Sequence, residues 1–259
     1  MRRLLFTILL LTLLGSCRSA AAPDGARVTL LHFSDYHSHA VPFYSDGDRD
    51  AAGISRAVAW LRPRASRRDT LVFSGGDMMN KGAPAWSDAY HCVEWKWFNG
   101  VVDAMAFGNH DADYGPDEFA RCRTSIDYPI LGANVLGSDG RPLFLVDGKP
   151  YALFVREGIR IGVFAVAGPD FPKLVGADRA PAAGVRFADP VATAREIVRR
   201  LRDEEKSDVV VMIGHEQAED DVRLARAVPG IDLIFGTHSH LLYGLHRIEG
   251  TSTWTVAPS

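Results

Sequence analysis

Several short stretches of this chain carry side chains that can bind metal ions or move protons. The densest is FGNHDADYG, residues 107–115, where an amide, an imidazole and two carboxylates lie between two glycines. An apolar run over 101–107 leads into it, so the polar cluster follows a predicted strand, a usual place for a site in an α/β protein. An Asx-rich turn that caps a helix would explain this stretch taken alone. That explanation weakens because four other stretches have the same design.

Each of those four stretches also places potential ligands directly after a predicted strand. In extended backbone, side chains two positions apart point the same way, so an i, i+2 pair can reach one centre. Imidazole, carboxylate and amide ligands without thiolate suit Zn²⁺, Mn²⁺, Fe or Co²⁺. The candidates outnumber the ligands of one ion with an open position, so we expect two divalent ions. The candidate ligands are Asp35, His37, Asp77, Asn109, His110, His215, His238 and His240.

Strands alternate with helices along the chain, which predicts α/β architecture with the polar loops at the carboxyl ends of neighbouring strands. The expected helices are Ala51–Leu61, Ser87–Gly100, Pro116–Ile126, Pro190–Glu205 and Asp220–Ala227. The expected strands are Arg27–Phe33, Thr70–Phe73, Val101–Phe107, Pro129–Ala133, Leu143–Val146, Tyr151–Arg156, Arg160–Ala165, Asp208–Ile213, Ile231–Phe235 and Thr253–Ala257. A Pro/Gly-rich loop is expected over 168–186.

The length and composition of the chain indicate one large globular domain with a hydrophobic core. The chain has 259 residues, of which 47% are hydrophobic and 24% are charged. Its formal net charge of -3 argues against a nucleic-acid polymer or an acidic lipid surface as its partner.

The first 17 residues have the features of a signal peptide. Arg2 and Arg3 precede the apolar run Leu4–Leu14, which is too short to span a bilayer comfortably. The run ends before Cys17 as in a bacterial lipoprotein signal, so we expect Cys17 to be lipidated and residues 18–26 to be a tether. An ordinary secretory peptide cut within 19–22 is the alternative. Either way we expect export to the periplasm or cell envelope.

Two cysteines remain after Cys17. An exported protein can join Cys92 and Cys122 in a disulfide, but two unpaired buried thiols are an equally good interpretation, because sequence sets no distance between them. Metal ligation by these thiols is not expected, because both lie in predicted helices away from the His/Asp stretches.

The ordered series D-x-H, G-D, G-N-H-D, a lone His and G-x-H-x-H resembles the calcineurin-like metallophosphoesterases. Within them the chain is most similar to the exported bacterial group of 5′-nucleotidases, UDP-sugar hydrolases and 2′,3′-cyclic phosphodiesterases. The motifs that carry this resemblance are GNHDADYG, LGANV at 131–135 and VPGIDLIFGTHSH at 228–240. The similarity runs from about residue 27 to 259, the N-terminal metal domain of that group. Ser38 and Thr237 depart from the pattern, since glycine is common after D-x-H and directly before the first histidine of the final H-x-H.

The resemblance implies a sandwich of two mixed β-sheets flanked by helices, with a dinuclear metal site at the carboxyl ends of strands. One metal ion would be held by Asp35, His37 and His240, the other by Asn109, His215 and His238, with Asp77 bridging them. His110, oriented by Asp113, would stabilise developing charge and protonate the leaving oxygen, and Asn109 and His110 would face the substrate phosphate.

The same resemblance implies hydrolysis of nucleotides or related phosphate esters by a metal-activated hydroxide, as in a 5′-nucleotidase. Proteins of that group continue into further strands and a C-terminal domain that clamps the nucleobase, so we expect residues 27–259 to lack that edge and that domain. Two alternatives remain at this stage. One is a hydrolase of the same site design that acts on a sulfur ester or a nucleotide-sugar pyrophosphate, and the other is an inactive, truncated metal-binding lipoprotein.

Other polar and aromatic residues are interpreted as structural. Asp111 is expected to be exposed or to begin a helix, and His32 to be a structural residue within a strand. The aromatic residues Trp86, Trp95, Trp97 and Phe98 are expected in the core, with a substrate-facing wall as the alternative. The acidic segment over 46–50 is expected to be a solvated loop.

Overall fold

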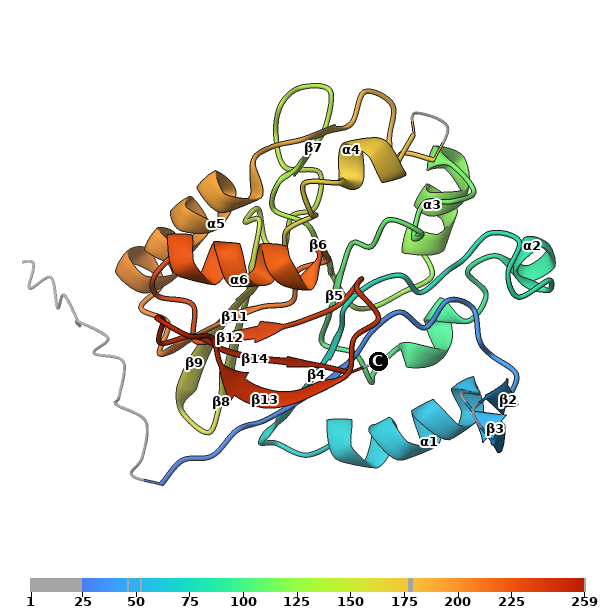
Figure 1. Cartoon of the computed structure of the whole chain (residues 1–259), viewed down its shortest axis with the longest axis horizontal. Helices are drawn as coiled ribbons and strands as arrows, with labels where there is room; N and C mark the ends of the chain where they lie inside the picture. Colours follow the sequence, from blue (N-terminus) through green and yellow to red (C-terminus); the bar gives the residue numbers. More distant parts are fainter. Residues whose placement is uncertain (1–24, 46, 52, 177–178, 259) are drawn as a thin grey trace, which may run out of the picture.

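The computed structural model describes residues 25–45, 47–51, 53–176 and 179–258. The predicted signal peptide, Cys17 and most of the predicted tether lie outside this described range. Two β-sheets pack face to face at the centre of the molecule, and helices cover their outer faces (Figure 1). This is the α/β sandwich that the sequence predicts.

The first sheet has the strand order β1-β4-β5-β6, and its strand pairs are all parallel. We expected both sheets to be mixed. This one is parallel because the chain crosses back through helical or loop segments before each new strand, so that every strand begins at the same edge. Its strands are β1 (Thr29–Phe33), β4 (Thr70–Ser74), β5 (Ala104–Ala106) and β6 (Ile130–Leu131).

The second sheet has the order β13-β14-β12-β11-β9-β8 and is mixed. Its inner strands are parallel, while β8 and β13 pair antiparallel at the two edges. Its strands are β8 (Ala152–Arg156), β9 (Ile159–Phe164), β11 (Val209–Met212), β12 (Leu233–Phe235), β13 (Tyr243–Arg247) and β14 (Trp254–Ala257). The edge strand β13 was not predicted.

Alternation along the strands builds three apolar layers, because successive side chains of a strand point to opposite faces. Leu71 and Phe73 of β4 and Val211 of β11 belong to the layer between the two sheets. Val72 of β4 packs into the layer beneath α1 and α3, and Val210 of β11 packs into the layer beneath α5 and α6. The sandwich therefore holds rigidly the strand ends that carry the polar loops.

Four helices of eight residues or more cover these layers within the described residues. They are α1 (Ile54–Ala65), α3 (Pro116–Arg123), α5 (Pro190–Arg199), which runs on into a π-helical turn η2 (Arg200–Glu204), and α6 (Ala218–Ala227). Figure 1 shows α5 and α6 on one side of the sandwich and α1 on the other. Among the described residues, no helix combines the length and the apolar character needed to cross a membrane.

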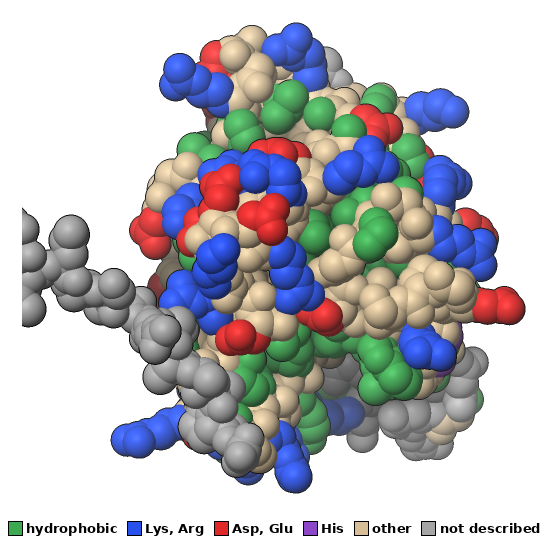
Figure 2. Space-filling model, turned by 90° about the vertical axis from the view of Figure 1, so that its left-hand side faces the viewer, with side chains coloured by type: hydrophobic (Ala, Val, Ile, Leu, Met, Phe, Trp, Pro, Cys, Tyr) green, Lys and Arg blue, Asp and Glu red, His purple; other side chains and the backbone are tan. Residues whose placement is uncertain are grey.

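The side of the molecule seen in Figure 2 carries charges of both signs. Lys and Arg side chains are interspersed there with Asp and Glu side chains. On the α5–η2 helix, Nη2 of Arg199 lies 2.8 Å from Oε1 of Glu196 and 2.9 Å from Oε1 of Glu204. This face therefore carries a mixture of charges, in agreement with the small net charge of the chain.

The helix predicted over Ser87–Gly100 is wrong in its extent. The segment forms only a short α2 (Ser87–Tyr90) and a 3₁₀ turn η1 (Trp95–Phe98). Trp95 and Phe98 are both fully buried, as expected of core residues. For Trp97 the same expectation is wrong, because its side chain is exposed, and Trp86 is half-buried. Residues three apart lie on one face of a 3₁₀ turn, so this turn suits their common burial.

Several smaller elements also differ from expectation. Helix α1 continues two residues past Pro63, because a proline in the last turn removes only one hydrogen bond. The segment 143–146 is not a strand, and Phe144 is buried in the core instead. The expected loops contain short strands and one helical turn: β2 (Phe43–Ser45), β3 (Asp48–Ala51), β7 (Val135–Leu136), α4 (Phe171–Leu174) and β10 (Arg186–Phe187).

The two cysteines that the sequence left open form a disulfide. Cys92 and Cys122 are bonded, with 5.7 Å between their Cα atoms. The bond joins the segment between α2 and η1 to α3. Of the two interpretations of the sequence, the disulfide is therefore correct.

Candidate active site

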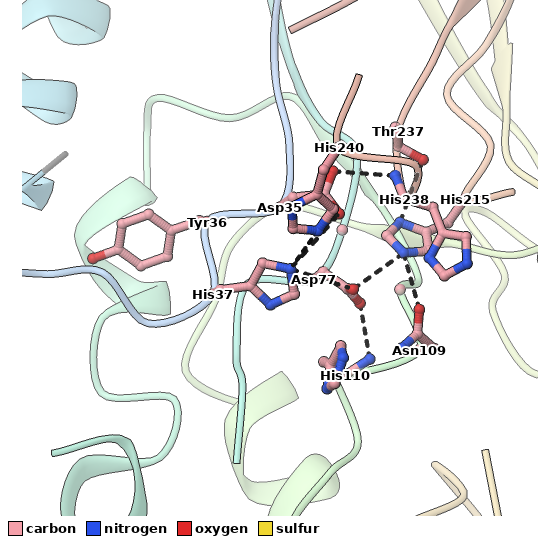
Figure 3. A network of polar contacts seen from close by, with 12 residues as sticks. Asp35, Tyr36, His37, Asp77, Asn109, His110, His215, Thr237, His238 and His240 are labelled. Atoms are coloured by element: carbon pink, nitrogen blue, oxygen red, sulfur yellow. Dashed lines mark hydrogen bonds and ion pairs between the residues drawn. The ribbon is translucent and has the colours of Figure 1, made fainter. Parts of the chain in front are cut away.

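The structure brings the seven metal ligands that the resemblance implies together at one edge of the sandwich (Figure 3). They lie on loops after β1, β4 and β5 of the first sheet and after β11 and β12 of the second. Parallel strands end at a common edge, and the two sheets are stacked with those edges adjacent, so loops far apart in sequence converge. The ligand candidates form two groups.

The first group is Asp35, His37 and His240, whose possible ligand atoms all lie within 4.8 Å of one another. The Nε2 atoms of His37 and His240 are 3.0 Å apart. Oδ1 of Asp35 lies 3.8 Å from Nε2 of His37 and 3.5 Å from Nε2 of His240. Three potential ligand atoms thus face a common point.

The second group is Asp77, His215 and His238, again with possible ligand atoms within 4.8 Å of one another. Nε2 of His215 lies 3.2 Å from both Oδ2 of Asp77 and Oδ1 of Asn109. Oδ2 of Asp77 is also 3.8 Å from Nε2 of His37 in the first group. Asp77 therefore stands between the groups, in a position where one carboxylate can serve both.

The residues present fit a pair of divalent cations. Oδ1 of Asp35, one of the three atoms that face the common point of the first group, is buried and has no hydrogen-bond partner within the described part of the chain. Burial lowers the pKa of His37, although Asp77 and Asp35 oppose this effect, so its imidazole favours the neutral form that ligates metals. A buried carboxylate oxygen without a partner is costly, and a cation held by Asp35, His37 and His240 would satisfy it.

His110 and Asp113 form a pair beside the two groups. Nδ1 of His110 is 2.7 Å from Oδ2 of Asp113. The backbone N–H of Lys81 donates to the same oxygen at 3.0 Å, and Nη1 of Arg179 donates to Oδ1 at 3.3 Å, so the carboxylate is held in place. Burial by itself lowers the pKa of His110, but the hydrogen bond to Asp113 and the charges of nearby carboxylates outweigh it and the pKa rises. The ring is therefore oriented and favours the protonated state.

Asp111 is buried, so the expectation of an exposed or helix-start carboxylate is wrong. Its Oδ2 accepts from the N–H groups of Gly108 at 2.7 Å and Asp77 at 3.1 Å, and its Oδ1 accepts from that of Met78 at 2.8 Å. Where a strand ends, its last N–H groups need acceptors, and this side chain supplies them. Asp111 thereby ties the loop after β4 to the loop after β5.

The backbone of the site is left-handed at many ligand positions, where we expected extended chain. The φ values are 54° at Asp35, 48° at His37, 49° at Asp77, 58° at His238 and 50° at His240. Non-glycine residues adopt this region at a cost of roughly 1–2 kcal/mol each, and such positions cluster at functional sites. Asp35 and His37 do reach one group, but through a tight turn and not through strand geometry. For His238 and His240 the expectation is wrong, because the two side chains belong to different groups.

Two further positions explain sequence features near the site. Ser38 has a φ of 57°, the region that glycine adopts at low cost, which accounts for the glycine common there in similar sequences. A Cβ atom at Gly108 would collide with the backbone N and side chain of Asp77, so the close approach of these loops requires glycine.

His32 stacks on Phe235 between the sheets with ring centroids 4.5 Å apart, as expected of a structural residue.

The sequence matches the model of the calcineurin-like phosphoesterase family over residues 28–242. The chain therefore belongs to this family, as the motifs predicted.

Among known proteins, it is 30% identical to a 5′-nucleotidase of Vibrio cholerae over 232 residues and 31% identical to protein UshA of Yersinia enterocolitica over 231 residues. Each alignment covers 82% of this chain and 40% of the relative, so the chain spans less than half the length of these relatives. The solved structure of a 5′-nucleotidase precursor from Thermus thermophilus superposes with a TM-score of 0.72 at 27% identity, covering 88% of this chain and 45% of that one.

Proposed function

We propose that this protein is an exported metal-dependent phosphoesterase that hydrolyses nucleotides or related phosphate esters. The observation that carries the proposal is the convergence of two ligand groups on Asp77, with the His110–Asp113 pair beside them. Membership of the calcineurin-like phosphoesterase family supports the reaction class, and the relatives named 5′-nucleotidase support nucleotides as substrates.

In this proposal Asp35, His37 and His240 hold one divalent ion and Asn109, His215 and His238 hold another. Asp77 would serve both ions, because its Oδ2 faces His37 on one side and His215 on the other, while its Oδ1 accepts from the backbone N–H of His110 at 2.8 Å. Two divalent ions in such a site supply an activated water nucleophile and neutralise charge on the phosphoryl oxygens. The buried ligand loops hold this arrangement in place before the substrate arrives.

His110 and Asn109 face the substrate phosphate in this proposal. The His110 ring lies edge-on to that of His37, with centroids 5.2 Å apart, so it borders the first ligand group. With Nδ1 held by Asp113, Nε2 is the atom available to the substrate. A protonated imidazole there would stabilise charge on the phosphoryl group and then give its proton to the leaving oxygen.

The test is a hydrolysis assay on the purified chain. An aryl phosphate, an aryl phosphodiester and 5′-AMP are assayed after chelation and again after Mn²⁺ or Zn²⁺ is restored. We expect turnover to disappear on chelation and to return with metal, and the ratio of the three rates distinguishes a monoesterase from a diesterase. A folded chain that binds two ions but hydrolyses none of the three would contradict the proposal.

Export and lipid anchoring at Cys17 belong to the same proposal and are supported by the signal-like N-terminus. Fractionation of cells that express the full chain should place it in the envelope. Cys17→Ser should release it from the membrane fraction if the cysteine carries the lipid. An unprocessed chain in the cytoplasm would contradict export.

A further inference from the structure

We propose that Asp170 is a positioning residue that selects the ring nitrogen of His238 available to a metal ion. Asp170 lies on the loop that follows β9, in a segment expected to be an ordinary Pro/Gly-rich loop, and it is not one of the candidate ligands. The inference rests on the two-metal centre proposed above and adds a residue to it.

The first step is the contact between the two side chains. Oδ2 of Asp170 lies 3.2 Å from Nε2 of His238. An ionised carboxylate only accepts hydrogen bonds, so Nε2 of a neutral His238 carries the proton and Nδ1 carries the lone pair. Nδ1 is then the ring nitrogen of His238 left to bind an ion, and His238 belongs to the same group as Asp77 and His215.

The second step is that Asp170 is itself held. Nε2 of Gln217 donates to the same Oδ2 at 3.2 Å, and Oε1 of Gln217 accepts from Oγ of Ser239 at 3.1 Å. Oγ of Ser239 in turn accepts from the backbone N–H of Ala218 at 2.8 Å. This chain of hydrogen bonds returns to the loop of His238 itself, so Asp170, Gln217 and Ser239 brace the histidine from three loops.

The third step is how the fold places these loops. Strands β9, β11 and β12 are parallel neighbours, and a further parallel bridge joins Ala167 to His215 beyond the strand ends. Gly168 permits the approach, because a Cβ there would lie 2.8 Å from Oδ1 of Asp170 and 3.0 Å from Cβ of Glu216. Phe171, which follows Asp170, packs near both His215 and His238, with ring centroids 5.8 and 6.4 Å away.

The consequence concerns metal affinity. A carboxylate that fixes the tautomer and orientation of a ligating histidine typically contributes 10–100-fold to metal affinity. Asp170→Ala should therefore weaken the binding of one of the two ions by about 10–100-fold and leave the other close to wild type. Asp170→Asn keeps the shape and an acceptor oxygen, so it should lose less.

The experiment titrates the chelated full-length chain with Zn²⁺ against a chromophoric competitor and repeats the titration with Co²⁺, whose visible spectrum reports the ligand geometry. The control is Asp139→Ala, which removes an exposed carboxylate that pairs with Arg141. Thermal unfolding of the metal-free variants checks that each is folded. We expect one weakened ion and an altered Co²⁺ spectrum in Asp170→Ala only.

Wild-type affinity for both ions in Asp170→Ala would overturn the inference. An equal loss for both ions would also overturn it, because that result marks a general effect on folding. A wild-type chain that binds fewer than two ions would instead contradict the proposed centre, and this inference with it.

Discussion

The two ligand groups differ in how firmly the protein holds their side chains. In the first group the His240 side chain is 59% exposed, and Nδ1 of His37 is buried without a hydrogen-bond partner in the described residues. In the second group His215 is fully buried, and its Nδ1 lies 2.7 Å from the backbone carbonyl oxygen of Gly75. His238 is braced by Asp170. The first group is therefore partly exposed to solvent, whereas the histidines of the second group are held by hydrogen bonds to residues outside the group.

This difference indicates that two groups of similar ligand types can differ in metal affinity. Outer hydrogen bonds fix the tautomer and orientation of a ligating imidazole, and burial excludes water that would compete for the ion. We infer that the second group holds its ion more tightly and that the ion of the first group exchanges more readily. The first group also borders His110, so the looser ion would lie on the side where the leaving group is protonated.

The largest expected effect is on turnover and comes from a residue that we place in neither group. His110→Ala should reduce activity by roughly 10²–10⁴-fold, because it removes the proton donor, while both ions remain bound. Activity assays and metal analysis of the same sample check this. His110 also lies within ligand distance of His37 and Asp77. Loss of one ion in the variant would identify His110 as a metal ligand. The first group would then have one more ligand, contrary to the weaker binding inferred for it.

The next effect concerns metal removal from the wild-type chain. Dialysis against increasing chelator should remove the ions in two steps, with dissociation constants that differ by about 10–100-fold. His240→Ala should abolish the weaker step, and His215→Ala should abolish the stronger one. Both are followed by metal analysis of the dialysed protein. Removal of both ions in a single step would show that the two groups bind equally, contrary to the comparison.

The smallest effect concerns the backbone of the first group. Ser38→Gly should raise the free energy of unfolding by about 1 kcal/mol, because glycine relieves the left-handed strain at a modest cost in chain entropy. The Oγ atom that is lost has no hydrogen-bond partner among the described residues. Chemical denaturation of the metal-free protein measures the change, with Ser138→Gly, in an exposed turn, as the control. Destabilisation would show that the Ser38 side chain supports the D-x-H turn.

Most of the fold class could be read from the order of elements, because strands and helices carry distinct apolar periodicities. The elements that sequence reasoning misjudged are those shaped by their neighbours. The 87–100 segment breaks because Trp95 and Phe98 share one buried layer and Cys92 is bonded to Cys122. Strand β13 forms by pairing with β14 at the edge of the second sheet. Most of its residues are exposed, so its sequence lacks the apolar pattern by which a strand is predicted.

The candidate site, too, has features that could be predicted from the sequence and features that could not. The candidate residues could be predicted from the sequence, because each lies in a short motif after a strand and its chemistry is visible in its residue type. The separation of His110 from the ligands came from the resemblance to a known family. Four features could be established only from the tertiary structure. They are the left-handed turns, the buried acceptor role of Asp111, the disulfide and the contact of Asp170 with His238. These depend on distances between loops of different strands. Such distances are set by sheet packing, which no local motif encodes.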